Sequence, residues 1–113
     1  MTLQELHEML KMTGFPVAYS HFNKSKSPPF ICHYEDEQEN IFADNKIIST
    51  KTSVMIELYT SKKNISAEKK LEELLKKNGI LWTSTQQYIK EENLFMKEYY
   101  IEIVEDKKTW LKN

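Results

Sequence analysis

Only two glycines occur in the 113 residues of this chain, and both lie in the same local pattern. The first is found in residues 10–15 (LKMTGF) and the second in residues 75–80 (LKKNGI). Glycine adopts the left-handed conformation that ends a helix, lysine in the last turn favours the negative end of the helix dipole, and the apolar residue after glycine folds back onto the leucine. The sequence therefore predicts two helices, which end at Gly14 and Gly79. An internal duplication is one explanation of the repeated ending, although helix ends of this kind recur for physical reasons alone.

The beginnings of the two helices are indicated as well. Thr2 and Glu5 have the Thr-x-x-Glu spacing of a capping box, so the first helix is expected to begin at Thr2. The second is expected to begin near Ser66. Both predicted helices are amphipathic. The apolar face comprises Leu3, Leu6, Met9 and Leu10 in the first helix, and Ala67, Leu71, Leu74 and Leu75 in the second.

Between and after the helices, apolar and polar residues alternate, which is the periodicity of a β-strand. We expect strands at residues 17–22, 30–34, 52–60, 80–89 and 94–104, and a short ladder of residues 40–43 with 46–49. The ladder is expected to close at Asp44-Asn45, residues that tolerate the positive φ of a hairpin turn, and the last two strands to be joined around Glu91–Asn93. The predicted class is α+β, with the order α-β-β-β-β-α-β-β. Such an order favours a mainly antiparallel sheet with the two helices packed on one face.

The length of the chain limits it to one domain. We expect residues 1–104 to form this domain and residues 105–113 to form a charged C-terminal tail. Trp110 and Leu111 in the tail are expected to dock on the domain or to anchor a neighbouring subunit. The chain has no apolar run of membrane-spanning length and no signal-peptide pattern at its beginning, so we expect a soluble protein made in the cytoplasm. A single cysteine, Cys32, fits a reducing compartment.

The charge balance argues against a nucleic-acid or membrane partner. The formal net charge is −1, so no global field attracts a polyanion. All basic residues are lysines, and the chain therefore lacks the planar guanidinium that binds phosphate or guanine in a bidentate manner. We predict no sequence-specific nucleic-acid binding and no membrane association.

No pattern of residues is typical of an active site. His21 and His33, on neighbouring predicted strands, lie near the acidic residues 35–37, so a small metal-dependent hydrolase is one alternative, but no metal-ligand motif accompanies them. Cys32 and His33 are adjacent in a strand and should point to opposite faces of the sheet, so they form no nucleophilic dyad. Two isolated glycines make no phosphate-binding loop. We predict that the protein is not an enzyme and that it binds neither cofactor nor metal.

Two polar segments are the candidate partner interface. The loop 23–29 ends in two prolines, and an acidic connection is predicted at residues 35–40, at the other end of the same strand. The competing interpretations are a plain long connection for the first segment and a solvated turn for the second. The candidate interface residues, which include the turn of the short ladder, are Lys24, Lys26, Glu35, Asp36, Glu37, Asp44 and Asn45.

Several segments of the chain, in their joint order, resemble a family of small head-to-tail joining, or tail-completion, proteins of long-tailed bacteriophages and prophages. Besides the opening helix, the resemblance is carried by residues 14–19 (GFPVAY), 29–37 (PFICHYEDE), 42–46 (FADNK), 56–60 (IELYT) and 71–82. It extends over about the first 104 residues and includes no catalytic motif. Residues 105–113 lie outside it.

The resemblance implies a fold similar to that of tail-terminator proteins and a non-enzymatic role in virion assembly. It implies a ring, commonly hexameric, at the head-proximal end of the tail, where the ring terminates the tail tube and joins it to the head. The implied partners are the tail-tube protein and a head-completion (connector) protein, and the implied location is the tail or neck of a virion assembled in the bacterial cytoplasm. We expect the isolated protein to be a monomer. The alternative is a monomeric prophage-encoded protein-binding module, and ring formation separates the two.

Overall fold

Both glycines follow a helix and are left-handed, as the sequence predicts. The computed structural model describes residues 1–106 and has helix α1 at Leu3–Lys11 and helix α2 at Ile65–Lys77. The φ angles of Gly14 and Gly79 are +85° and +69°. Capping decides where each helix begins. The capping box of Thr2 and Glu5 is present in α1, and the Asn64 side chain accepts a hydrogen bond from the Ala67 N–H at the beginning of α2.

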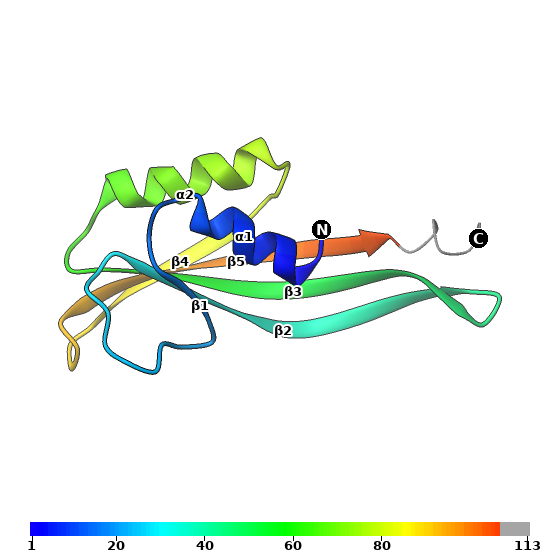
Figure 1. Cartoon of the computed structure of the whole chain (residues 1–113), viewed down its shortest axis with the longest axis horizontal. Coiled ribbons are helices and arrows are strands. Elements are labelled where there is room, and N and C mark those ends of the chain that lie inside the picture. The colour runs from blue at the N-terminus through cyan, green and yellow to red at the C-terminus, as the bar shows by residue number, and fades with distance from the viewer. Residues whose placement is uncertain (107–113) are drawn as a thin grey trace.

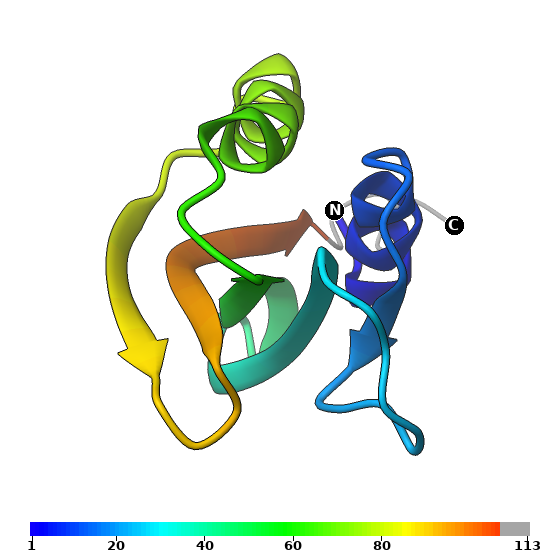
Figure 2. The same cartoon turned by 90° about the vertical axis from the view of Figure 1, so that its left-hand side faces the viewer.

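Within residues 1–106, five strands form one sheet, and α1 and α2 pack on the same face of this sheet (Figure 1). The strand order is β1-β2-β3-β5-β4, and every neighbouring pair is antiparallel except β1 with β2, which is parallel. Figure 2 shows the sheet curling around the side on which the helices lie. The predicted α+β class is thus confirmed. The strands are β1 (Val17–Tyr19), β2 (Phe30–Ala43), β3 (Lys46–Thr60), β4 (Thr83–Ile89) and β5 (Leu94–Asp106).

The core lies between the helices and the concave face of the sheet. Alternate residues of β3 and β5 point into it, as expected for strands with one covered face. Each fully buried leucine or isoleucine contributes roughly 1.5–3 kcal/mol relative to an exposed one. The side chains with the least exposure are Leu6 and Leu10 of α1, Leu71 and Leu75 of α2, and Ile31, Ile56, Leu58 and Tyr99 of the sheet.

The short ladder predicted at residues 40–43 and 46–49 is the far end of two long strands. β2 and β3 pair along their whole length and are joined by the turn Asp44-Asn45, whose φ angles of +51° and +63° fit a tight hairpin. The prediction of an acidic connection at residues 35–40 is wrong, because these residues lie inside β2. Their backbone pairs with β3, with one irregularity between Glu35 and Glu37.

The hairpin extends beyond the helices as an arm (Figure 1). We define the arm as residues 37–53 together with residues 102–106 of β5, which pair with its β3 side. Neither β1, which pairs with residues 31–33, nor β4, which pairs with residues 94–100, reaches it. The molecule is therefore elongated, with extents of 51 × 26 × 24 Å. β5 continues past the predicted boundary at residue 104 to Asp106, whereas Trp110 and Leu111 lie outside the described residues.

Candidate functional site

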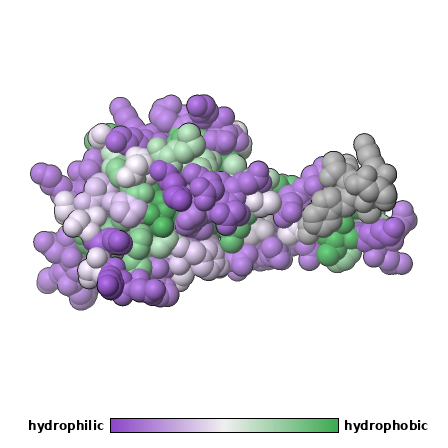
Figure 3. All heavy atoms as spheres, in the orientation of Figure 1, coloured by the Kyte–Doolittle hydropathy of each residue, from purple (hydrophilic) through white to green (hydrophobic). Residues whose placement is uncertain are grey.

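The end of the arm carries a small group of exposed apolar side chains, which we call the arm tip: Ile41, Phe42 and Ile47. Phe42 and Ile47 are direct cross-strand partners in the hairpin, and Phe42 is 63% exposed. The space-filling view shows hydrophobic residues near this end of the molecule, well away from the core (Figure 3). These side chains make the arm tip a candidate contact surface.

Acidic residues dominate the surface around the arm. Glu35, Asp36, Glu37 and Glu39 are all exposed on β2. Lys51, inside the arm, has its Nζ 3.7 Å from Glu102 Oε2 in an exposed ion pair. Pairs of this kind contribute little to stability, because water and salt screen them. The Lys51–Glu102 pair therefore adds little to the stability of the arm.

The loop at residues 23–29 lies against the body, away from the arm tip (Figure 1). Its ends are fixed by aromatic contacts: the Phe22 ring meets the Phe30 ring edge-on at 5.6 Å, and Phe30 stacks on Tyr59 at 4.8 Å. Lys26 Nζ lies 5.6 Å from the centroid of the Phe22 ring. Lys24 belongs to the same loop.

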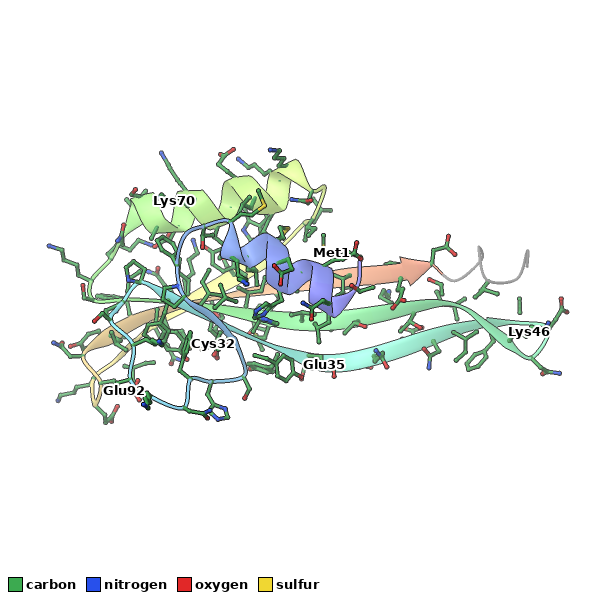
Figure 4. All side chains as sticks on the ribbon, viewed as in Figure 1. Met1, Cys32, Glu35, Lys46, Lys70 and Glu92 are labelled. Atoms are coloured by element: carbon green, nitrogen blue, oxygen red, sulfur yellow. The ribbon has the colours of Figure 1, made fainter. Side chains whose placement is uncertain are left out.

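The predicted interface residues thus occupy three separate places. Lys24 and Lys26 belong to the loop, residues 35–37 lie where β2 leaves the body, and Asp44-Asn45 form the end of the arm. Figure 4 shows Glu35 beside the body and Lys46 at the far end of the hairpin. The structure does not bring these residues into one site. Residues 35–37 and the turn Asp44-Asn45 nevertheless lie along the same β2–β3 hairpin.

A contact between the buried His33 and the half-buried His7 is a feature that the sequence analysis missed. His7 Nδ1 lies 2.8 Å from His33 Nε2, and the Tyr19 ring packs edge-on against His33. His33 is 1% exposed, and burial, assisted by the positive charge that His7 can carry, lowers its pKa to about 4. The sequence does contain a signal for this contact. His7 follows Leu3 by four residues and precedes Leu10 by three, so it lies on the same helix face as these core leucines.

The histidines do not assemble the metal site considered from the sequence. His21 lies beyond the end of β1, and its Nδ1 lies 3.2 Å from the Ser20 hydroxyl. Within residues 1–106 there is no group of three or more His, Cys, Asp and Glu side chains placed to hold a metal ion. The separation of Cys32 from His33 is confirmed: His33 contacts α1 on the concave face, whereas Cys32 is paired with Glu57 and points to the other face.

Cys32 is also a poor nucleophile. Burial, together with the neighbouring Glu57 carboxylate, raises the pKa of its thiol to about 11. The pKa of Glu57 is itself raised by burial and by Glu98, its cross-strand partner, despite a hydrogen bond from the Tyr59 hydroxyl. A thiol with a raised pKa is protonated at neutral pH and reacts slowly.

An ionic network holds α2 on the sheet. Lys97 Nζ lies 3.0 Å from Glu68 Oε1 and 3.3 Å from Glu72 Oε2, and the Tyr99 hydroxyl donates to Glu72 Oε2 at 2.7 Å. Burial alone would raise the pKa of Glu68, but hydrogen bonds from Lys63 and Lys97 outweigh it and lower the pKa. These charges are paired within the fold, which indicates a structural role.

Comparison with known protein families and curated proteins assigns no family to this chain. No helix in the described part of the chain has the length and apolar character needed to cross a membrane. No family model matches the chain, and no curated protein matches it.

Proposed function

We propose that this chain is a non-enzymatic virion assembly protein of a phage or prophage. It forms a ring at the head-proximal end of the tail, where it terminates the tail tube and joins the tube to the head. The proposal rests on the resemblance of the ordered segments over about the first 104 residues. It is also compatible with an α+β fold in which the charged groups beneath α2 are engaged in structural pairs.

The arm is the structural observation that supports the proposal. It is only three strands wide, it projects from the body, and it presents apolar side chains at its tip. Exposed apolar area costs about 25 cal/mol per Å² when no partner covers it. A projecting element also gives each subunit a contact surface far from its own body. Head-to-tail assembly into a closed ring requires two such different surfaces on one chain.

Electron microscopy of particles made without this protein tests the proposal. We expect tail tubes of uncontrolled length and heads without tails, because both tube termination and head joining are lost. Restoring the protein should restore tails of uniform length attached to heads. Tails of normal length joined to heads in its absence would refute the proposed function.

A second experiment separates the ring from the alternative of a monomeric protein-binding module. Purified protein is mixed with purified tail tubes, and the tube ends are imaged. We expect additional density at one end of each tube, in the form of a ring. Tubes without added density, together with a monomer in solution, would favour the binding module.

A further inference from the structure

We propose that the arm tip of one copy docks in a groove between α1 and α2 of the next copy in the ring. This inference rests on the proposed function and specifies the two surfaces that meet. The groove is open, with a volume of about 650 Å³. We call it the helix groove. Its lining residues are Met12, Thr13, Lys70, Glu73, Leu74, Lys76 and Lys77.

The helix groove offers an apolar floor for the arm tip. Met12 follows α1 and is 69% exposed, which is unusual for a methionine beside a core. Leu74 is half-buried next to it on α2. Methionine is flexible and polarizable, so it adapts well to an incoming aromatic ring. The Phe42 side chain is the largest exposed apolar group on the arm and is the natural occupant.

The charges of the two surfaces are complementary. Lysines 70, 76 and 77 surround the helix groove, and Glu73 is the acidic residue among the lining side chains. The arm tip is flanked by the carboxylates of Glu39 and Asp44 and by the ammonium group of Lys46, so its local charge is net negative, and the exposed acidic run 35–37 lies further along β2. Bringing the arm to the groove therefore places carboxylates next to ammonium groups, which aids association and sets the orientation of the two copies.

The same charges disfavour a contact between two arm tips. A two-fold contact would bring together two tips that each carry Glu39 and Asp44 against the single Lys46, and surfaces of the same net charge repel. Contact within one subunit is excluded by the geometry, because the arm extends away from the body. Figure 4 shows Lys70 on α2 and Lys46 at the arm end toward opposite ends of the molecule. The contact is therefore heterologous, and its repetition builds a ring when the rotation closes.

Disulfide trapping in the full chain tests this contact. The variant Phe42→Cys/Met12→Cys carries one new thiol on each surface, and both positions are exposed. Under mild oxidation at high protein concentration, we expect a ladder of dimers, trimers and larger species. Each single variant should form no such ladder. A mixture of the two single variants should stop at the heterodimer, because each chain then contributes one surface.

The control keeps one thiol and moves the other. Phe42→Cys/Leu81→Cys places the second thiol on an apolar residue that is 89% exposed but lies outside the helix groove. It should show no more cross-linking than the original chain, whose Cys32 is buried. Adding Glu39→Lys or Lys77→Glu to the trapping variant should remove most of the ladder, and adding both should restore part of it.

Two results would overturn the inference. A dominant dimer from Phe42→Cys alone would show a contact between two tips, and a trapping variant that cross-links no more than the Leu81 control would show that the surfaces do not meet. These failures are distinct from failure of the proposed function. Uncontrolled tail length without the protein, combined with no ladder, would keep the function and discard this contact. A ladder combined with normal tails in the absence of the protein would keep this contact and discard the proposed function.

Discussion

His7 Nδ1 lies 2.8 Å from Nε2 of His33, and this contact joins α1 to β2 beneath the helix. One proton lies between these two nitrogens, because one ring nitrogen donates and the other accepts, whereas the buried Nδ1 of His33 has no hydrogen-bond partner within residues 1–106. His33 is buried, so its charged form would lose the hydration that an exposed imidazolium keeps, and a positive charge on His7 would add repulsion. The pair therefore tolerates the neutral form of His33 and resists the charged one.

Acidification should destabilise the protein through His33. The pKa of His33 in the native protein is lowered to about 4, below its ordinary value of 6.5. The stabilising effect of neutral His33 is fully present above pH 6.5 and is lost as the pH falls toward 4, because the unfolded chain takes up a proton that the native chain does not. The total loss is roughly 3 kcal/mol. Urea denaturation at several pH values measures it.

The histidine effect is separable from that of the carboxylates. Glu5 and Glu68, whose pKa values are lowered, add a loss of stability only below their ordinary value of 4.5. His33→Gln should flatten the dependence of unfolding free energy on pH between 6.5 and 5, whereas His21→Gln, at an exposed position, should leave it unchanged. Equal slopes in both variants would contradict the assignment to His33.

Removing the Tyr99 hydroxyl should weaken the attachment of α2. Tyr99→Phe deletes the donor to Glu72 while keeping the buried ring, so we expect a loss of about 1–2 kcal/mol in the free energy of unfolding. Tyr100→Phe is the matched control, because the Tyr100 side chain is 40% exposed and lies on the other face of the sheet. Equal unfolding midpoints for the two variants would mean that the hydroxyl contributes nothing.

Gly14→Ala and Gly79→Ala should each cost about 1 kcal/mol. A Cβ at either position meets nothing within 4 Å, so the cost comes from the positive φ alone. Asparagine tolerates this conformation better than alanine, and Gly→Asn at the same positions should lose less. Thermal unfolding measures both series. An alanine variant as stable as the original chain would show that the helix end relaxes without strain.

Reversing the charge of the acidic run should impair assembly while leaving the stability of the fold nearly unchanged. Glu35, Asp36 and Glu37 are exposed, so changing all three to lysine should alter stability by no more than about 0.5 kcal/mol per substitution. Head-to-tail joining should nevertheless be impaired in a complementation assay. Glu91→Lys/Glu92→Lys, in the exposed turn between β4 and β5, is the control for charge alone. Normal phage yield from the folded triple variant would remove this run from the functional surface.

The isolated protein should be mainly monomeric at micromolar concentration. The proposed contact uses a small apolar tip and exposed charges, which salt screens, so the tail tube is needed to hold neighbouring copies together. Light scattering at two salt concentrations measures the mass. A stable two-fold dimer would count against head-to-tail assembly.

The local features of the fold were predictable from the sequence, because they depend on neighbouring residues. The helix ends at Gly14 and Gly79 need a left-handed residue, and the turn at Asp44-Asn45 needs two residues that tolerate positive φ. The parallel pairing of β1 with β2 was not predicted. It depends on the path of a long connection, which no local pattern records.

The arm was missed for a different physical reason. Residues 35–40 of β2 are exposed on both faces, so they lack the alternation that marks a half-buried strand. Glu35, Asp36 and Glu37 of the candidate interface were therefore predicted in a connection, although they belong to β2. The contact of His7 with His33 joins positions 26 residues apart. Contacts between residues so far apart in the sequence produce no periodic pattern of apolar and polar residues.

The position of β5 has a consequence for the nascent chain. Although β5 follows the other four strands of residues 1–106 in the chain, it lies between β3 and β4 in the sheet. Until it is made, β3 has an unpaired edge from Ser49 to Thr60, and its hydrogen-bonding groups are open to other chains. The β2–β3 hairpin can form early, because its pairing is local. Sheet closure must wait for the final strand, so incomplete chains that stop after α2 should aggregate rather than fold.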